Sequence, residues 1–244
     1  MRVISIFICV FLCGSLSEAS AEDTSPSFSQ KLDIQVRYDN RSNRPSREQY
    51  RLRYYPSLAL TSTWSVNSFI VTGDDFSSSH NTFGSDTTDY LYARRLYLRH
   101  ESNAGKTELG IIPTYKGRVS STGLSKDGWI TGIRHVRKLQ NNTALEIVVG
   151  QLANAEASEA FNVGEEDEYF EIEYSAKMGE RHSYEASFER MLNGTFARAE
   201  YRFRINEEDT AFVELVQRTD ESAAKIVVGT SGEFAASAFN TSYP

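Results

Sequence analysis

The chain has 244 residues, of which 40% are hydrophobic, with a mean hydropathy of −0.44 and a formal net charge of −7. This acidic balance argues against general nucleic-acid binding, because nucleic acids attract basic surfaces. After the first residues no apolar run approaches the roughly 20 residues of a membrane-spanning helix. That excludes a helical membrane protein but leaves a β-barrel, whose strands place hydrophobic residues at every second position.

Residues 1–21 predict a cleaved signal peptide. Arg2 gives a positive start, the apolar stretch VISIFICVFLCGSL follows, and the small residues ASA at 19–21 form a cleavage site. Both cysteines, Cys9 and Cys13, lie within this peptide, and the residues before them do not fit a lipoprotein signal. We therefore expect an exported chain of residues 22–244, one domain with neither a disulfide framework nor a thiolate metal site.

The first strand of this domain is predicted at residues 31–39, KLDIQVRYD, where apolar and polar side chains alternate without a break. The two faces are Leu32, Ile34, Val36 and Tyr38 against Lys31, Asp33, Gln35, Arg37 and Asp39. An inward apolar face would mean a soluble sandwich or a lipocalin-like barrel. An outward apolar face would mean a membrane barrel with a charged lumen.

The same alternation recurs along the chain and predicts about twelve strands, with no competing helical period. The other segments are YRLRYYPSLAL at 50–60, a strand from Trp64 to about Thr72, YLYARRLYLRH at 90–100, TELGIIP at 107–113, residues 129–138, TALEIVVGQ at 143–151, EYFEIEYSA at 168–176, SYEASFE at 183–189, FARAEYRFR at 196–204, TAFVELVQR at 210–218 and AAKIVVG at 223–229. Two of them are less regular. Residues 129–138 mix both faces, and Arg94 falls on the otherwise apolar face of its strand.

Residues 183–204 predict a hairpin whose two-residue type I′ turn is Asn193-Gly194, because both turn positions need positive φ. The resulting register brings opposite charges together on one face and apolar groups together on the other. A slip of one residue would destroy both sets. The expected pairs are Leu192–Thr195, Glu189–Arg198, Glu185–Arg202, Phe188–Ala199, Ala186–Tyr201 and Tyr184–Phe203.

Longer and shorter connections alternate between these segments, as is typical of outer-membrane barrels. The longer ones are RSNRPSRE, GDDFSSSHNTFGSDTTD, KGRVSSTGLSKDG and ANAEASEAFNVGEED, and the shorter ones are TST, SNAG, QNN and KMGE. The alternation breaks at the Asn-Gly hairpin, which by count lies on the long-loop side. Aromatic residues near many strand ends also suit interfacial girdles. Together these features turn the apolar face of residues 31–39 toward lipid.

The segment RRLYLRHESNAGKTELGIIPTYKG, followed by DGWITGIRHVRKL, resembles Gram-negative porins in its order of strand, tight turn, Gly-containing strand, long loop and returning strand. The resemblance extends over about residues 47–152. It implies an outer-membrane location and passive passage of solutes. The chain is shorter than porins of about 16–18 strands, and it ends in FNTSYP rather than on an aromatic residue. A further strand near this end would raise the strand number to 14.

No catalytic or metal-binding motif is found. The four histidines, His80, His100, His135 and His182, lie on different segments without His-x3-His spacing. There is no Gly-x-Ser-x-Gly elbow, and the acidic segment NVGEEDEYFEIE lacks the spacing of a calcium loop. Only Asp74-Asp75 near His80 leaves room for a rim site, so we expect no catalytic residue, no metal and no cofactor.

If the apolar faces meet lipid, the charged faces line the lumen, because a Lys or Arg at the lipid midplane costs about 2–4 kcal/mol. The predicted pore-lining residues are Arg51, Arg53, Arg95, Arg99, Glu171, Glu173, Glu185, Glu189, Arg198, Arg202 and Arg204, with Glu200 on the same face. Arginines gather on the early strands and carboxylates on the later ones. We expect a transverse field over a narrow lumen, which would bias ion entry. The alternative is that these charges pair and fill the barrel.

The sequence therefore predicts an all-β fold, an antiparallel transmembrane β-barrel of about 12 strands in a Gram-negative outer membrane. The expected function is a porin-like channel for passive diffusion of small hydrophilic or charged solutes. The alternatives are a non-conducting structural or surface-interaction barrel and, less favoured, a barrel enzyme. The expected partners are outer-membrane lipid, lipopolysaccharide and small solutes or ions, with no nucleic acid, and the oligomeric state stays open.

Overall fold

A computed structural model describes residues 25–41, 44–73, 79–84, 91–114, 127–152, 156–162 and 168–232. The predicted signal peptide at residues 1–21, Asp74-Asp75 and the C-terminal FNTSYP lie outside these described residues. Within them, no helix is long and apolar enough to cross a membrane.

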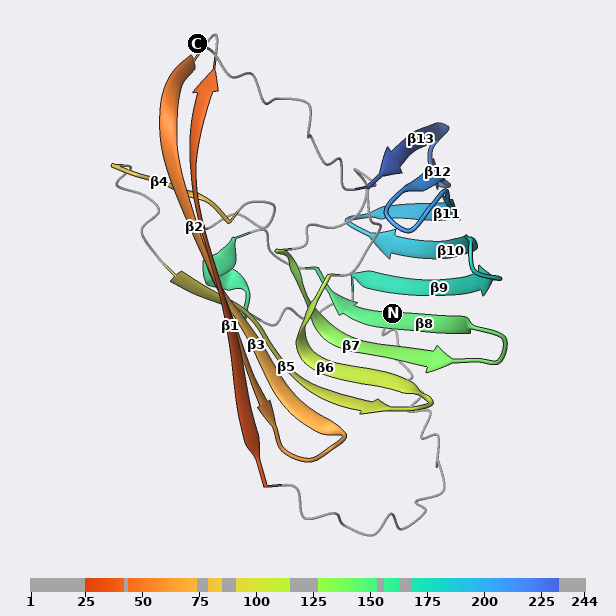
Figure 1. The fold of residues 1–244 in the computed structure, drawn as a ribbon, viewed down its shortest axis with the longest axis horizontal. Coiled ribbons are helices and arrows are strands. Elements are labelled where there is room, and N and C mark those ends of the chain that lie inside the picture. Colours follow the sequence, from red (N-terminus) through yellow and green to blue (C-terminus); the bar gives the residue numbers. More distant parts are fainter. Residues whose placement is uncertain are drawn as a thin grey trace, which may run out of the picture.

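The described chain forms one antiparallel sheet of 13 strands (Figure 1), which confirms the predicted all-β fold of about 12 strands. Each strand lies next to its neighbour in sequence, except that the short β4 pairs only with β2. The strands are β1 (Ser27–Arg41), β2 (Arg44–Ala59), β3 (Trp64–Thr72), β4 (Asn81–Thr82), β5 (Leu91–Ser102), β6 (Gly105–Pro113), β7 (Trp129–Lys138), β8 (Thr143–Gln151), β9 (Tyr169–Met178), β10 (His182–Met191), β11 (Gly194–Arg204), β12 (Thr210–Arg218) and β13 (Ala223–Ser231). A 3-10 turn, η1 (Ala157–Glu159), precedes β9.

The two faces of this sheet differ in chemistry, because successive side chains of a strand point to opposite sides. On β9, Tyr169 and Glu171 are buried, whereas Phe170 and Ile172 are 39% and 38% exposed. On the edge strand β1 the apolar side chains are exposed, Ile34 at 65%, and Lys31, Gln35 and Arg37 on its other face are exposed as well. We call these sides the charged face and the apolar face. They match the orientation predicted for the first strand, and no second sheet covers the apolar face in the described chain.

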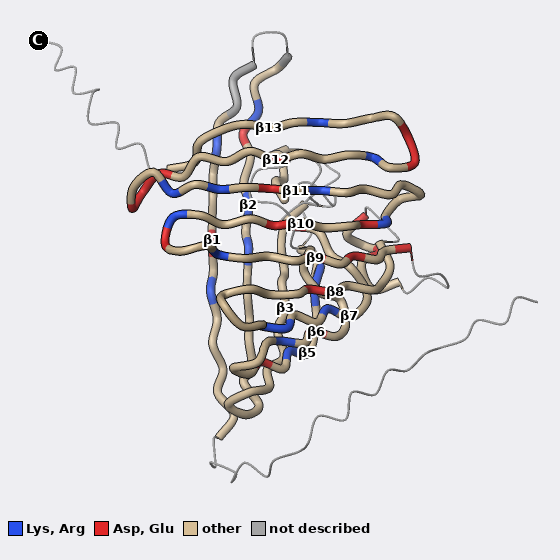
Figure 2. The backbone as a smooth tube through the Cα atoms, turned by 90° about the vertical axis from the view of Figure 1, so that its right-hand side faces the viewer, with Lys and Arg blue, Asp and Glu red and all other residues tan. Residues whose placement is uncertain are grey.

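The sheet is not closed. β1 and β13 are its two edges, and no residue pair joins them in the described part of the chain. Figure 2 shows β1 and β2 running across the direction of β9–β13. Such crossing follows from twist, since neighbouring strands rotate by about 20–25° and the rotation accumulates. The expected closed barrel is therefore present as an open, strongly twisted sheet.

The first connection also differs from the prediction. RSNRPSRE was expected to be a loop, but β1 extends to Arg41 and β2 begins at Arg44, and these two residues are paired. The 15 and 16 residues of β1 and β2 make this the longest hairpin of the sheet. The connections β3–β5, β6–β7 and β8–β9 are long, as predicted, and we call their side of the sheet the long-loop end. The opposite side is the short-turn end.

The predicted register of the β10–β11 hairpin is wrong by two residues. Met191 pairs with Gly194, so the turn residues are Leu192 and Asn193, with φ of 48° and 62°. Both positions thus adopt the positive φ that a type I′ turn requires, but Gly194 is the first residue of β11. Because the side-chain period of a strand is two, this shift changes every direct partner and preserves both faces.

A β-bulge resolves the irregular position of Arg94. Phe69 pairs with Arg95 and Ile70 with Ala93, so Arg94 is the extra residue of β5. Arg94 is fully buried, and its guanidinium donates hydrogen bonds to the carbonyl oxygens of Thr72 and Gly73. The bulge therefore removes this charge from the apolar face, where the simple alternation would have placed it.

A buried apolar cluster covers part of the charged face at the long-loop end of β6–β11. It is a feature that the sequence pattern did not single out. Its members are Ile112, Ile130, Val148, Leu152, Tyr169 and Met191, with Tyr97 and Phe196 packed against them. The charged face is therefore layered along the strands, with apolar packing at one end and ionised groups beyond it.

Candidate functional site

Two groups of charged side chains occupy the charged face. The arginine group comprises Arg51, Arg53 and Arg95 on β2 and β5. The carboxylate group comprises Glu173, Glu185, Glu189, Glu200 and Glu214 on β9–β12. A third set, on β5–β8, lies between them in the order of the strands.

The arginine group is held mainly by connections rather than by neighbouring strands. Arg53 Nη2 donates to Asp127 Oδ2 at 2.8 Å, across 74 residues of sequence. Arg95 Nε donates to the carbonyl oxygen of Gly128 at 2.8 Å, and its guanidinium lies 4.6 Å from the centre of the Phe69 ring. Asp127 and Gly128 immediately precede β7, so this connection is anchored on the charged face of β2 and β5.

Two groups outside the strands report the electrostatics of this region. Burial opposes ionisation of Asp127, but hydrogen bonds from Arg53 and Ser79 outweigh it and lower the pKa of the carboxyl. Burial lowers the pKa of His80, and the positive charges of nearby arginines lower it further. The imidazole of His80 lies 3.3 Å from Gln35 Oε1 on the edge strand β1. The region is therefore positive and stabilises anionic groups.

The carboxylate group surrounds Arg198 of β11, which is 6% exposed. Its guanidinium nitrogens lie 3.1 Å from a carboxylate oxygen of Glu173, 3.6 Å from Glu185, 3.8 Å from Glu189, 3.8 Å from Glu200 and 3.5 Å from Glu214. A second cation, Arg202, binds both carboxylate oxygens of Glu185, at 2.9 and 3.2 Å, and also contacts Glu200. Five carboxylates therefore share two guanidinium groups.

The observed hairpin register explains how Arg198 reaches so many carboxylates. Ser187 lies directly opposite Arg198 and is 3.4 Å from its Nε. Glu185 and Glu189 are therefore two positions to either side, within reach of the same guanidinium. In the predicted register Arg198 would face Glu189 directly and would lie farther from Glu185. The pairs Glu185–Arg202 and Glu189–Arg198 still form, but diagonally.

The set between the two groups is a chain of ion pairs across β5–β8. Arg99 Nη2 lies 2.8 Å from Glu108, which also accepts from Arg134 at 2.9 Å. Arg134 in turn donates to Glu146 at 2.9 Å. Arg134 and Glu108 are 1% and 0% exposed. Lys106 lies 3.5 Å from the same Glu108 carboxylate, so opposite charges alternate across these strands between the positive and negative regions.

The structure distributes the predicted pore-lining residues unevenly. It brings Glu173, Glu185, Glu189, Arg198 and Arg202 into one network. Glu171 is fully buried and accepts a hydrogen bond from Tyr169 Oη at 2.6 Å. Arg204, at the end of β11, is exposed and lies apart from the carboxylate group. The residues that were not predicted are Asp127, Glu108, Arg134, Glu146 and Glu214.

The missed residues share weak sequence signals. Arg134 and Glu108 occupy strands in which the two faces look mixed, but both fit a strict period of two once Gly132 and Gly110 are counted on the charged face. Asp127 lies in a connection, where alternation carries no information. In the described part of the chain, no group of three His, Cys, Asp or Glu residues is placed to hold a metal ion. The arrangement thus offers a charged surface and no metal site among these residues.

Solved structures with a similar fold include porins. The chain superposes on a triple mutant of the Rhodopseudomonas blastica porin with a TM-score of 0.56 and 10% identity, covering 87% of this chain and 81% of that one. A mutant of the same porin with five substitutions gives a TM-score of 0.55 and 11% identity, and a double mutant gives 0.53 and 10%, both with the same coverage. No protein-family model and no curated protein sequence matches the chain. The resemblance to porins expected from residues 47–152 is thus a shared fold.

Proposed function

We propose that this protein is an outer-membrane channel for passive diffusion of small hydrophilic or charged solutes. The carrying observation is the division of one continuous sheet into an exposed apolar face and a face that carries the ionised groups. A face lined by ionised groups suits a hydrated lumen, and an exposed apolar face suits lipid, where each charge would be costly. The porin-like fold supports this assignment. Lipid, lipopolysaccharide and solutes are the partners it implies, and no catalytic step is part of it.

The arrangement of charge suggests how ions would be selected. The arginine group on β2 and β5 and the carboxylate group on β9–β12 would lie on different sides of the lumen, so a transverse field would act on a passing solute. Within the arginine group Arg51 has the longer ion-pair distance, 4.0 Å to Asp33 of the edge strand, against 2.8 Å from Arg53 to Asp127. We therefore propose Arg51 as the residue whose charge most directly biases ion entry, with Arg53 and Arg95 in supporting positions.

Reconstitution of the purified protein into planar bilayers tests the proposal. We expect discrete conductance steps, and their absence with correctly folded protein would overturn it. Under a salt gradient, Arg51→Gln should move the reversal potential toward cation preference. Arg190→Gln is the matched control, because Arg190 is exposed on the apolar face of β10. Equal reversal potentials for the two variants would remove Arg51 from the ion pathway.

The apolar cluster at the long-loop end favours a second candidate, a structural barrel without conductance. Six buried apolar side chains on the charged face would fill part of the lumen rather than line it with water. The bilayer measurement separates the two candidates directly. A folded protein that inserts into lipid without opening a current path would support the structural barrel.

A further inference from the structure

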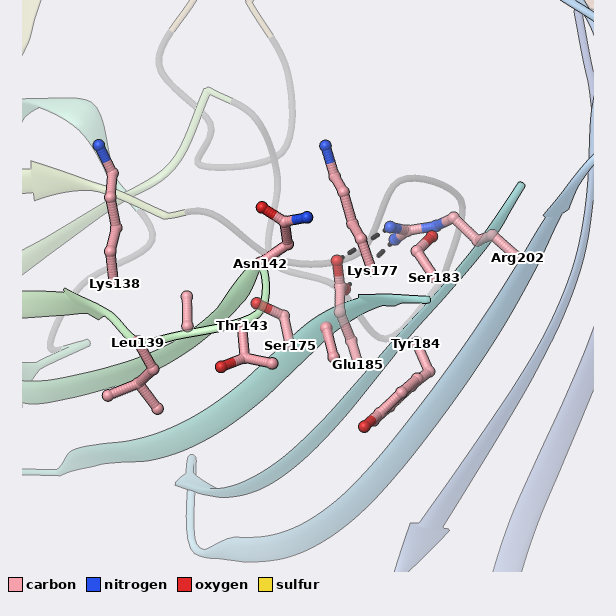
Figure 3. Close-up of a pocket in the computed structure, with 12 residues that line it drawn as sticks. Lys138, Leu139, Asn142, Thr143, Ser175, Lys177, Ser183, Tyr184, Glu185 and Arg202 are labelled. Carbon is pink, nitrogen blue, oxygen red and sulfur yellow. Dashed lines mark hydrogen bonds and ion pairs between the residues drawn. The ribbon is translucent and has the colours of Figure 1, made fainter. Parts of the chain in front are cut away.

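A cavity of about 390 Å³ opens on the charged face at the short-turn end of β7–β11. Figure 3 shows that Lys138 of β7 and Lys177 of β9 extend toward the same side of it. Lys138 is the last residue of β7 and Lys177 is the last but one of β9, so they lie beside the turns at residues 139–142 and 179–181. The strands therefore place two ammonium groups that are 39 residues apart in sequence on the same face of the sheet, with β8 between them.

The charge of this cavity is not balanced by the protein. In the described part of the chain, no ion pair joins Lys138 or Lys177 to a carboxylate. The carboxylate that lines the cavity belongs to Glu185, and Arg202 already binds both of its oxygens, at 2.9 and 3.2 Å. The two lysines thus leave an excess of positive charge in this cavity, which we call the mouth of the proposed channel at the short-turn end. The carboxylate group farther along the same strands has the opposite excess.

Neutral donors complete the cavity. Ser183 is directly opposite Lys177 in the β9–β10 pair, and Ser175 lies two residues before Lys177 on the same face. Their hydroxyls line the cavity together with the ammonium groups. A smaller adjoining cavity of about 100 Å³ is lined by Arg181 and Arg204 as well and by one carboxylate, that of Glu180, so cationic side chains outnumber carboxylates there too.

We propose that this mouth is a binding site for small phosphate-bearing solutes, with Lys138 and Lys177 as the charged ligands and Ser175 and Ser183 as hydroxyl donors. A solute with more than one phosphate group, such as pyrophosphate, presents several acceptor oxygens and negative charges over its length, so it suits two separated ammonium groups and the hydroxyls beside one of them. Lysine acts as a point charge without a fixed fork, which suits solutes that differ outside the phosphate. This inference rests on the proposed function only for its effect on current.

Binding at this site would affect the conductance of the channel differently from the two sides of the membrane. An anion bound at the short-turn end meets the carboxylate group next, and like charges repel at close range. The mouth would therefore concentrate phosphate-bearing solutes on one side of the barrel. A multivalent phosphate added to that side should reduce the conductance, and the same addition to the other side should have less effect.

Equilibrium binding of pyrophosphate to the folded protein in detergent micelles tests the site without reference to conductance. We expect saturable binding that weakens at least tenfold in Lys138→Gln/Lys177→Gln. The control Lys31→Gln/Lys225→Gln removes two ammonium groups from the edge strands β1 and β13 and should bind like the natural sequence. Equal urea midpoints for all three proteins would show that the fold is retained. Unchanged binding in Lys138→Gln/Lys177→Gln would overturn the site.

Two further measurements test the preference for phosphate and the effect of binding on the current. Citrate should bind at least fivefold more weakly than pyrophosphate, and equal binding would overturn the assignment to phosphate. In planar bilayers, pyrophosphate should reduce the current from one side only, and the double lysine variant should lose this effect. Absence of any conductance would defeat the proposed channel while leaving the binding result to stand or fall by itself. Conductance without a sided effect would overturn the inference.

Discussion

The arginine group and the carboxylate group lie on the same face of one sheet, but they are assembled in different ways. Arg53 pairs with the carboxylate of Asp127 and Arg95 donates to the carbonyl oxygen of Gly128, and both partners belong to the connection before β7. The carboxylates around Arg198 come from four consecutive strands. One group therefore depends on how a connection folds back, and the other depends on strand register.

This difference has consequences for stability. In the carboxylate group one buried guanidinium, that of Arg198, lies within 3.8 Å of five carboxylates, so its removal weakens the compensation of several negative charges at once. In the arginine group each cation has its own partner, and some partners are neutral carbonyls. Loss of one contact there leaves the others in place. Substitutions in the two groups should thus differ in size and in pH dependence.

The largest effect is expected for Arg198→Gln. Breaking a buried charge network by removing one partner costs about 3–5 kcal/mol, and we expect a loss of this size in the free energy of unfolding. Urea titration followed by tryptophan fluorescence measures it. Arg190→Gln, on the exposed face of the neighbouring strand, should change stability by less than about 0.5 kcal/mol. Equal effects of both variants would contradict the shared role of Arg198.

A smaller effect is expected for Asp127→Asn. This change removes the charge that Arg53 binds at 2.8 Å and leaves a hydrogen-bonding oxygen in place. Truncating one partner of a buried, charge-assisted hydrogen bond costs about 1–3 kcal/mol, so we expect a loss within this range at neutral pH. If Asp127→Asn lowered the free energy of unfolding by more than Arg198→Gln, the carboxylate group would not be the more sensitive of the two groups, which would contradict the account.

The pH dependence of Asp127 sharpens the same prediction. Its pKa in the folded protein is lowered, against an unfolded value of about 3.9. Between the two pKa values the unfolded state therefore binds more protons than the folded state. The contribution of ionised Asp127 to the free energy of unfolding is complete above the unfolded pKa, and it is lost as the pH falls through the folded pKa. The stability difference between the natural sequence and Asp127→Asn should narrow below about pH 4. A constant difference down to pH 2 would contradict the ion pair.

The smallest effect concerns the turn that sets the register of the carboxylate group. Leu192 adopts a φ of 48° and is 65% exposed. A residue with a Cβ pays about 1–2 kcal/mol in this conformation, so Leu192→Gly should leave stability unchanged or raise it by up to about 1 kcal/mol. If the turn were Asn193-Gly194 instead, Leu192 would be a strand residue. Its replacement by glycine would then destabilise the hairpin.

The alternation of side chains was sufficient to predict twelve of the thirteen strands, because it depends only on a period of two, but it missed β4 and the extension of β1 and β2 into RSNRPSRE. The same property explains the error in the β10–β11 hairpin. A shift of two residues keeps Phe188 on the apolar face and Glu189 on the charged face, so the pattern cannot distinguish the two registers. The choice depends on tertiary contacts, here the position of Arg198 between Glu185 and Glu189.

Connections were less predictable for a different reason. Nothing in the spacing of Asp127 links it to Arg53, since the two residues are 74 positions apart and meet only when the connection before β7 folds onto β2. The apolar cluster around Ile112 and Val148 was also missed. Its members occupy positions that alternation assigns to the polar side, and only the packed structure shows that this side has an apolar layer.

The central claim is that the apolar face meets lipid and the charged face meets water. Both cysteines lie within residues 1–21, so a single cysteine introduced into residues 22–244 is unique once these are absent. On β9, Glu173→Cys and Ser175→Cys lie on the charged face, and Ile172→Cys and Tyr174→Cys lie on the apolar face. In lipid vesicles, a charged, water-soluble thiol reagent should modify the first two at least tenfold faster. Equal rates at all four positions, or the reverse order, would contradict the account.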